Sequence, residues 1–351
     1  MQIMQMKTYC QTPAKLILTG EHAVLFGAPA LSMAVNLLTE CEIEFNTLSD
    51  SSKLEFSIEL RDYQSERDYS FLEWQNHIVN IQSRYTLYEK NTLAIQAVCT
   101  HPIDLVLLSL HFFHINYPLK KGHWQIKIAS KVPRGKGLGS SASVIISLLH
   151  SLYSQHQIPI IEEELLGLAQ QIESFQHGHA SGLDTTTLFK GGLIRFQQGK
   201  PIKPLSMQNF HGWLIDTGYP ESTTGQAVSY VHDHFHFHHL IWQAFQVTTT
   251  KIEQAWQTAD AVGLKKAITE NEQLLENIGV VPSRVQAFIK RINQHPNKAA
   301  KICGAGSVIG DNAGVVLCLS QQPPTELCDE FGYTLSPLSL NETGSRCEVV
   351  F

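Results

Sequence analysis

The sequence predicts an α+β protein with mixed sheets and two domains, and three observations lead to this fold class. The 351 residues are enough for two domains of ordinary size. Segments with the two-residue alternation of β-strands gather in the first part of the chain, whereas residues 226–293 follow a largely helical pattern. The two kinds of element do not alternate regularly, as they would around a parallel doubly wound sheet.

The predicted boundary between the domains is a polar stretch with two prolines at residues 197–212. It lies where the strand-rich part of the chain gives way to the helix-rich part. We therefore expect an N-terminal domain at 1–205 and a C-terminal domain at 206–351. This division leaves the final strand free to return to the N-terminal domain.

The first domain is expected to combine short strands with apolar helices. Residues 54–60, LEFSIEL, alternate as a half-buried strand does. Further strands are expected at 9–18, 30–36, 41–45, 124–129 and 191–196. Helices are expected at 143–153 and 162–175, with mixed helical character at 65–98, and the second helix begins with three acidic residues that suit a helix N-terminus. Residues 103–115 are too short an apolar run to cross a bilayer, and predict a buried helix or a pair of strands.

The second domain is expected to place strands around its helical region, at 213–216, 314–319 and 347–351. Breaks between helices are predicted near Gly263 and Gly279, and a second glycine-rich loop at 301–310. Five histidines crowd into residues 232–239, but their spacing lacks the acidic partners of a catalytic metal site. This run therefore predicts a solvated helix or loop.

Composition narrows the class of protein. Hydrophobic residues make up 43% and charged residues 17%, the balance of a globular chain. The net charge of −6 argues against a general nucleic-acid binder. The seven cysteines form no CxxC pair and are odd in number, which favours free thiols in a reducing compartment. Because the first residues also lack the pattern of a secretory signal, we expect a cytoplasmic protein without a membrane partner.

The sharpest motif is the glycine-rich stretch at residues 132–142, VPRGKGLGSSA, which lies between a predicted strand and an apolar helix. Glycines at alternate positions let backbone amides approach a ligand closely. The following helix directs its free N–H groups and the positive end of its dipole at the loop. Ser140 and Ser141 add hydroxyls for a phosphate or a Mg²⁺ ion. The stretch therefore predicts an anion site suited to phosphates.

Three interpretations of this loop follow from the residues alone. A Walker A motif is excluded, because Gly135-Lys136 is followed by Gly137 and not by serine or threonine. The dinucleotide pattern is met formally by Gly137, Gly139 and Ala142, which is a weak match in isolation and would suit an NAD-dependent oxidoreductase. A turn capped by serine, with no ligand, is the third interpretation.

A resemblance to a known family supports the phosphate interpretation. The segment PRGKGLGSSAS resembles the ATP-binding motif of the GHMP kinases, which act on galactose, homoserine, mevalonate and phosphomevalonate. Residues 12–27, 173–184 and 216–223 are similar to further blocks of this family, in the order and form of its mevalonate kinases. The sequence departs from the pattern in two places. Ala180 replaces a usual proline, and Ser307, Val308 and Ile309 replace glycines in a third loop.

The resemblance implies a two-domain fold, with an N-terminal ribosomal-protein-S5-like α/β domain and a C-terminal ferredoxin-like α+β domain. It also implies ATP-dependent, Mg²⁺-assisted phosphorylation of mevalonate at its C5 hydroxyl, giving 5-phosphomevalonate and ADP. The expected partners are therefore mevalonate and ATP, in a monomer or a homodimer, with no nucleic acid. The alternatives are a GHMP kinase for phosphomevalonate or another small alcohol, and a nucleotide-binding homologue without turnover, which the altered third loop suggests.

The same resemblance implies roles for individual residues. Asp184 is the expected catalytic base, although it is equally placed to be the N-cap of a helix beginning at Thr185. Lys15 is the expected cation beside it, and its alternative is an edge-strand lysine that reaches solvent. Ser141 and Glu173 are the expected Mg²⁺ ligands, and a solvated helix residue is the alternative for Glu173.

The remaining expected contacts concern the nucleotide and the acceptor. The residues expected to bind ATP are Gly135, Gly137, Leu138, Gly139, Ser140, Ser141 and Ala142. Glu21, His22 and Thr223 are expected to bind the acceptor, and a purely structural Glu–His pair is the alternative for the first two.

Overall fold

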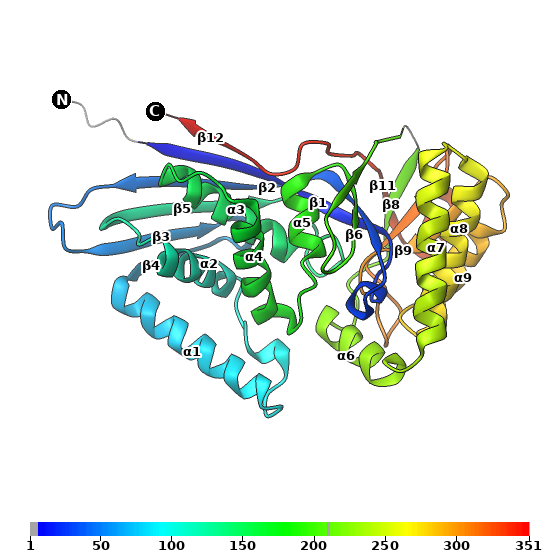
Figure 1. Ribbon diagram of the computed structural model, residues 1–351, viewed down its shortest axis with the longest axis horizontal. Coiled ribbons are helices and arrows are strands. Elements are labelled where there is room, and N and C mark those ends of the chain that lie inside the picture. Colours follow the sequence, from blue (N-terminus) through cyan, green and yellow to red (C-terminus); the bar gives the residue numbers. More distant parts are fainter. Residues whose placement is uncertain (1–5, 209–210, 351) are drawn as a thin grey trace.

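The computed structural model describes residues 6–208 and 211–350, and Figure 1 shows two sheets placed along the long axis of the molecule. In this part of the chain the first sheet has eight strands, in the order β12-β1-β2-β5-β3-β4, with β6 on β2 and β7 on β6. Its strands are β1 (Lys7–Thr19), β2 (Ala30–Asn46), β3 (Leu54–Leu60), β4 (Ser65–Ser70), β5 (Gly122–Ser130), β6 (Leu193–Phe196), β7 (Lys203–Leu205) and β12 (Arg346–Val350).

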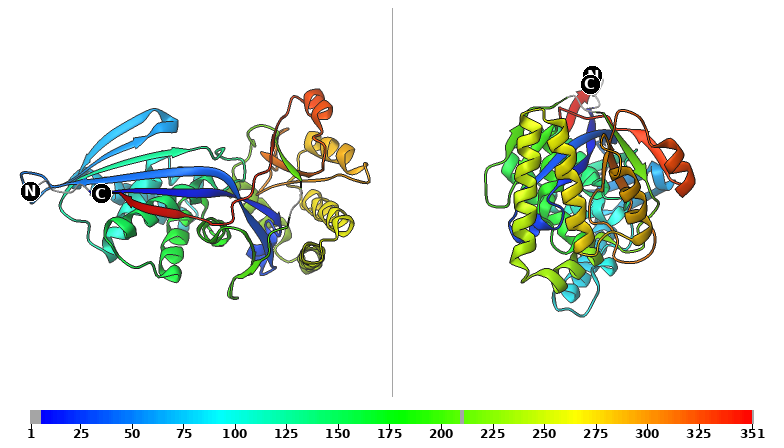
Figure 2. Two further views of the ribbon diagram at one scale, coloured as in Figure 1. Left: turned by 90° about the horizontal axis from the view of Figure 1, so that it is seen from above. Right: turned by 90° about the vertical axis from the view of Figure 1, so that its right-hand side faces the viewer.

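Helices cover one face of this first sheet, as the view from above in Figure 2 shows. They are α1 (Phe71–Glu89), α2 (Ile103–Asn116), α3 (Ser140–Gln155), α4 (Glu162–His177) and α5 (Leu183–Lys190), with the short 3-10 helices η1 (Ala23–Phe26), η2 (Arg61–Tyr63) and η3 (Ile95–Ala97). Helix α2 is buried on every side from Ile103 to Leu110, and again at Phe112 and Phe113, which explains its mostly apolar sequence. The expected buried helix at 103–115 is thus confirmed.

The second sheet is smaller and wholly antiparallel, in the order β11-β8-β10-β9. Its strands are β8 (Gly212–Asp216), β9 (Ala299–Ile302), β10 (Val315–Leu319) and β11 (Thr334–Pro337). The helices of this part are α6 (Thr224–Phe235), α7 (His239–Gln257), α8 (Ala261–Asn277), α9 (Ser283–Asn293) and α10 (Thr325–Phe331). Both parts mix strands and helices without regular alternation, so the predicted α+β class is confirmed. Within the described ranges, no helix combines the length and apolar character that crossing a membrane requires.

Most predicted elements are present, and the differences have local causes. The alternation of residues 54–60 appears as a strand with alternate residues buried. Residues 30–36 and 41–45 belong to one long strand, β2, because β1 pairs with it along almost its whole length. The break predicted near Gly263 is confirmed at residues 258–260, between α7 and α8, where Asp260 caps α8 by accepting the Gly263 N–H at 2.9 Å. The break at Gly279 is confirmed, while Phe351 of the predicted last strand lies outside the described residues.

The two ends of the described chain meet in the first sheet. Strand β12 pairs antiparallel with β1, and Cys10 lies opposite Cys347 in this register. Between β11 and β12 the chain therefore returns from the second sheet to the first, and Figure 1 shows β12 beside β1. Strand β7 ends at Leu205 and β8 begins at Gly212, so the chain changes sheets within the segment predicted as a boundary.

Candidate active site

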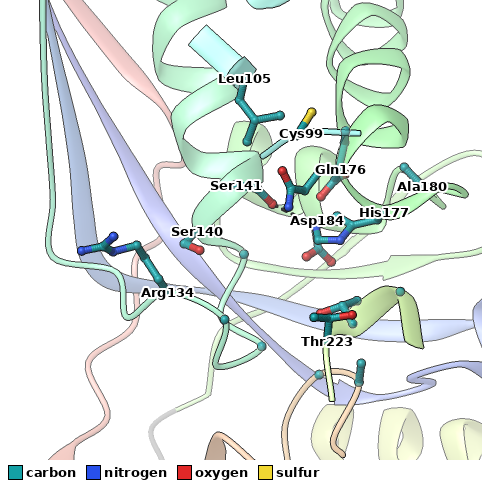
Figure 3. A pocket seen from close by; sticks show the side chains of 18 of the residues that line it. Cys99, Leu105, Arg134, Ser140, Ser141, Gln176, His177, Ala180, Asp184 and Thr223 are labelled. Carbon is teal, nitrogen blue, oxygen red and sulfur yellow. Dashed lines mark hydrogen bonds between the residues drawn. The ribbon is translucent and has the colours of Figure 1, made fainter. Parts of the chain in front are cut away.

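A cleft of about 630 Å³ lies where the two parts of the molecule meet. Its walls come from the middle of β1, the loop 132–139 that precedes α3, the facing ends of α4 and α5, and the loops that follow β8 and β9. Figure 3 shows Ser141, Gln176, His177 and Asp184 converging from three helices on its interior, with Thr223 opposite. Large clefts between two packed parts of a chain are the usual position of small-molecule sites.

Lys15 and Asp184 form an ion pair on the wall of this cleft. Their Nζ and Oδ2 atoms are 3.1 Å apart, and the lysine side chain is 3% exposed against 26% for the aspartate. Lys15 lies inside β1, whose neighbouring residues are buried, and its backbone N–H donates to the Leu138 carbonyl at 3.0 Å. The interpretation of Lys15 as an edge-strand residue reaching solvent is therefore wrong, because a buried ammonium needs a partner and Asp184 provides it.

Asp184 is not a helix cap. Helix α5 begins at Leu183 with Gly182 as its N-cap, so the Asp184 carboxylate lies in the first turn and faces the cleft. A carboxylate in this place gains from the positive end of the helix dipole. The half-open environment leaves it in reach of a ligand, while the ion pair with Lys15 holds it in place.

Glu173 lies beside this pair on α4, and its carboxyl is buried. Burial, and then the negative charge of Asp184, raise the pKa of Glu173 to about 8, against the opposing effect of Lys15. Across the described ranges, Glu173 has neither a hydrogen bond nor an ion pair, although it lines the cleft. A buried carboxyl without a protein partner is a group that a cation would satisfy.

Ser141 lines the same cleft as Glu173 and offers a hydroxyl oxygen there. Its Oγ atom lies 3.2 Å from His177 Nε2, and burial lowers the pKa of His177 to about 4, so that the imidazole is neutral. A hydroxyl and a carboxylate are hard oxygen donors of the kind that Mg²⁺ prefers, and this ion usually keeps phosphate and water as its other ligands. No group of three or more acidic, histidine or cysteine side chains suited to a metal occurs among residues 6–208 and 211–350. The two predicted ligands thus fit a Mg²⁺ ion shared with a phosphate.

The glycine loop brings backbone amides to the cleft. Gly137 has a φ of 84°, and a Cβ there would lie 2.4 Å from the Cys303 carbonyl oxygen. Gly139 has a φ of 75°, and a Cβ there would lie 2.9 Å from Lys15 Cγ. Glycine is therefore required at both positions, by conformation and by space. Helix α3 then begins at Ser140 without a side-chain cap in the described chain, which leaves its first N–H groups free for an anion.

Glu21 and His22 do not pair with each other but with the second part of the chain. Glu21 forms a buried ion pair with Lys301, and His22 Nε2 lies 2.9 Å from the Ala305 carbonyl. Burial lowers the pKa of His22 to about 4. Glu21 Oε2 and His22 Nδ1 each remain buried without a hydrogen-bond partner in the described ranges. Both residues line the cleft, and each has one bond to the second part of the chain and one polar atom that no described group satisfies.

Thr223 also lines the cleft, but its hydroxyl already has partners. It is the N-cap of α6, where its side chain accepts the Gln226 N–H in a reciprocal capping box. Gln96 Nε2 donates to the same oxygen at 2.9 Å. The signal for this cap, a threonine followed three residues later by glutamine, is present in the sequence.

The altered third loop has a structural explanation. Ser307 is 1% exposed, and its Oγ lies 3.0 Å from Ser222 Oγ and donates to the Ile309 carbonyl at 2.7 Å. The Ser222 and Val308 N–H groups complete the cluster, each donating to the opposite serine at 3.1 Å. These bonds fasten the third loop to the loop 217–223 on the wall of the cleft. The substitution of glycine by serine therefore adds a connection to the site.

Several residues at or near the cleft were not predicted. Lys136 pairs with Asp216, Gln176 faces Asp184, and Arg134 stacks on Tyr63 with 3.7 Å between its guanidinium carbon and the ring centroid. Lys136 and Arg134 occupy variable positions of the glycine motif, so the motif itself carried no signal for them. The histidines at 232–239, by contrast, are exposed as predicted and lie across the junction of α6 and α7.

Comparison with known proteins supports the predicted family. Residues 104–192 match the family model for the GHMP kinases N terminal domain. The mevalonate kinase of Thermococcus onnurineus is 25% identical over 361 residues, covering 98% of this chain and 99% of the relative. The mevalonate kinase of Pyrococcus abyssi is 25% identical over 311 residues, covering 84% of each.

Solved structures show the same fold. A crystal structure of a mevalonate kinase superposes with a TM-score of 0.75 at 21% identity, covering 95% of this chain and 99% of the other. The Lactococcus lactis galactokinase complexed with galactose gives a TM-score of 0.76 at 12% identity, covering 97% and 95%. At these identities the likeness defines the fold alone.

The fold is that of the GHMP kinase superfamily, a class of small-molecule kinases, and residues 104–192 match the model of its N-terminal domain. The predicted resemblance and two-domain GHMP fold are thus confirmed. Within that superfamily, the relatives that align with nearly the whole chain include the mevalonate kinases of Thermococcus onnurineus and Thermococcus gammatolerans.

Proposed function

We propose that this chain transfers the γ-phosphoryl group of ATP to the C5 hydroxyl of mevalonate, giving 5-phosphomevalonate and ADP. The observation that carries the proposal is the Lys15–Asp184 pair, 3.1 Å apart, facing the same cleft as an uncapped helix N-terminus. A base and an anion site in one cavity are what phosphoryl transfer to an alcohol requires. The names of the relatives favour mevalonate as the alcohol.

In the proposed reaction the hydroxyl oxygen of the acceptor attacks the γ-phosphorus, while Asp184 accepts the hydroxyl proton. The bond from the γ-phosphorus to its bridging oxygen breaks, and ADP leaves with the electron pair. Lys15 holds the Asp184 carboxylate in position before the transfer and balances charge on the transferring group. Because phosphoryl transfer depends mainly on positioning and charge, the rigid placement of both residues supports these roles.

The glycine loop and α3 would hold the nucleotide phosphates. We assign this contact to the backbone of Gly135, Gly137, Leu138 and Gly139 and to the first turn of α3, Ser140–Ala142. Ser141 and Glu173 would hold Mg²⁺, which supplies charge neutralisation on the phosphates when it is bound. The buried, unpartnered carboxyl of Glu173 supports this assignment.

The acceptor would lie between the Lys15–Asp184 pair and the loops of the second part. Glu21 Oε2 and His22 Nδ1 are the buried polar atoms available to it on that side. Thr223 lies on the opposite wall, where its capping role makes it a boundary of the acceptor space.

We also propose the division into domains at 1–205 and 206–351, with the final strand β12 returning to the first domain. We further propose a cytoplasmic monomer or homodimer.

A coupled ADP-release assay tests the proposal. Purified protein with Mg-ATP is offered mevalonate, phosphomevalonate, galactose or homoserine, and ADP formation without acceptor is subtracted. Turnover with mevalonate alone is the expected result. Turnover with another acceptor would keep the mechanism and correct the substrate. Binding of ATP with no turnover on any of the four would contradict the proposed activity and favour a non-catalytic nucleotide-binding protein.

A further inference from the structure

Lys136 occupies the glycine loop, yet its side chain turns away from the cleft. Gly135 and Gly137 on either side line the cavity, whereas Lys136 does not. Its ammonium instead pairs with the Asp216 carboxylate at the end of β8, with side chains 11% and 33% exposed. The same nitrogen lies 4.5 Å from the centroid of the Tyr219 ring, which does line the cleft. The ammonium is thus already neutralised by a carboxylate and an aromatic face.

This pair lies where three loops meet. The backbone of Lys136 packs against Gly314, where a Cβ would lie 2.9 Å from the Lys136 carbonyl oxygen. Thr217, next to Asp216, donates its N–H to the Gly314 carbonyl at 2.9 Å. Asp216 Oδ1 accepts the Gly218 N–H at 2.9 Å and so shapes the turn that leads into the loop 217–223. The ion pair therefore fastens the glycine loop to a loop of the second sheet.

The fastened loops form opposite walls of the cleft. Tyr219, Ser222 and Thr223 line it on one side, and the glycine loop lines it on the other. From Lys136 the contacts continue to the catalytic pair, because the Leu138 carbonyl accepts the Lys15 N–H at 3.0 Å. A displacement of the loop 217–223 would thus act on the phosphate-binding backbone and on Lys15 through short, direct contacts.

We propose that Lys136 and Asp216 are positioning residues that couple the nucleotide side of the cleft to the acceptor side. Their ion pair holds the glycine loop against the loop 217–223, so that a nucleotide bound to the glycine loop orders the wall that receives the acceptor. By reciprocity, a bound acceptor then tightens nucleotide binding by the same factor. This inference rests on the proposed kinase function and adds to it a structural cause of cooperativity between the two substrates.

The competing interpretation is that Lys136 leaves Asp216 and binds the phosphates directly. Two substitutions separate the interpretations. If the ion pair is what matters, Lys136→Met and Asp216→Asn break the same contact and have the same effect. If Lys136 is a phosphate ligand, Lys136→Met weakens ATP binding, while Asp216→Asn releases the ammonium and strengthens it.

The experiment measures binding by calorimetry in wild type, the two single variants and the double variant. A non-hydrolysable ATP analogue with Mg²⁺ is titrated with and without mevalonate, and mevalonate with and without the analogue. We expect each single variant to lose about tenfold of the coupling between the two ligands, and the double variant to lose no more than either single one. Lys131→Met is the matched control, since this exposed lysine precedes the same loop and forms no ion pair in the described chain.

Three results would overturn the proposal. Opposite effects of Lys136→Met and Asp216→Asn on ATP affinity would make Lys136 a phosphate ligand. Wild-type coupling in both single variants would remove any role for the pair. Additive losses in the double variant would show that the two residues act independently. Thermal melting excludes misfolding as the cause, and Lys136→Gln provides a polar variant if Lys136→Met does not fold.

A readout without acceptor separates this inference from the proposed function. Hydrogen exchange of the Gly218 and Ala313 amides reports the junction directly, because both donate to partners within it. Faster exchange of these amides is expected in both single variants. Unchanged exchange in both variants would contradict the proposed role of the Lys136–Asp216 ion pair. If the wild-type protein fails to phosphorylate mevalonate, the proposed function is wrong. Hydrogen exchange and ATP affinity would still show whether the Lys136–Asp216 pair holds the two loops together.

Discussion

Two of the lysine–carboxylate pairs close to the cleft differ sharply in their access to water. Lys15 and Asp184 are 3.1 Å apart, with the carboxylate 26% exposed. Lys301 and Glu21 pair with side chains 0% and 1% exposed. The Asp184 carboxylate is open to the cleft, whereas Glu21 is buried and has one oxygen without a hydrogen-bond partner among the described residues. The same two residue types thus form an open pair in one place and an enclosed pair in the other.

The enclosed pair belongs to a larger buried network. Lys301 also donates to the Ile302 carbonyl at 2.6 Å, and Glu272 accepts the Ile302 N–H at 2.9 Å. Burial alone would lower the pKa of Lys301, but the Glu21 carboxylate overcomes this effect and raises it. The network joins the end of β1 to β9 and α8, which are far apart in the chain. Its removal should therefore loosen the contact between the two parts of the molecule.

The largest effect is expected at the open pair. Asp184→Asn keeps the shape of the side chain but removes the base, so kcat should fall by a factor of about 10²–10⁴ while ATP still binds. Steady-state kinetics and calorimetry with an ATP analogue measure the two quantities. The variant should also lose some stability, because Lys15 stays buried without its anionic partner, so kcat is measured per folded protein. Near-normal turnover in this variant would exclude Asp184 as the base.

A substitution in the enclosed pair should lower the stability of the protein more than it lowers kcat. Lys301→Met leaves Glu21 buried without its cation, and the free energy of unfolding should fall by about 3–5 kcal/mol. Lys15→Met is the matched variant, since the carboxylate that it leaves behind is solvated. Denaturant unfolding of both variants, with kcat where the protein folds, makes the comparison. Equal losses of stability in the two variants would end the distinction between an open and an enclosed pair.

The stability of the enclosed network should also depend on pH, because Glu272 belongs to it and titrates. Burial raises the pKa of Glu272 to about 8, above the value of about 4.3 in an unfolded chain. Between these values the folded protein holds the proton that the unfolded chain has lost. This contribution to stability is therefore complete below about pH 4.3 and is lost as the pH rises to about 8. The loss should be on the order of 5 kcal/mol at most, at about 1.4 kcal/mol for each unit of pKa difference.

Glu272→Gln should remove this dependence. The amide oxygen can still accept the Ile302 N–H, but it does not titrate. The difference in unfolding free energy between variant and wild type should therefore grow with pH from 5 to 8, in favour of the variant. Denaturant unfolding at four pH values measures it. Parallel curves for the two proteins would show that Glu272 keeps an ordinary pKa.

The smallest effect is expected at Thr223, on the open side of the cleft. Thr223→Ala removes the cap of α6 and should cost about 1 kcal/mol of stability. Thr223→Ser is the control, because it retains the capping hydroxyl. If Thr223 acts only through its cap, any rise in KM for mevalonate in Thr223→Ala should accompany the loss of stability. Both KM and stability should return to wild-type values in Thr223→Ser. A rise in KM with unchanged melting would instead indicate direct contact with the acceptor.

The predictions from sequence succeeded where the signal was local. Strand β3 could be predicted because its burial alternates residue by residue, while β4 was missed, because an exposed edge strand carries mostly polar side chains. Lys15, Glu173 and Asp184 were found through motifs that lie within short blocks. Their proximity to one another was supplied by the family resemblance and not by the residues alone.

Contacts between distant segments could not be predicted. The partners of Lys136 and Lys301 lie 80 and 280 residues away, and nothing near either lysine marks its partner. For the same reason Glu21 was expected to face the acceptor or His22, and its pairing with Lys301 was missed. The serines at 222 and 307 appeared as a defect in a glycine pattern, because only the fold brings them together.

The pairing of β12 with β1 has a consequence for how the protein is made. Strand β1 is synthesised early, whereas β12, which pairs with one of its edges, is synthesised only after all strands of the second sheet. That edge of β1 therefore stays unpaired through most of the synthesis and can pair with the wrong strands. Protection of that edge in the nascent chain, by a chaperone or by quick completion of translation, should govern the yield of folded protein in cells.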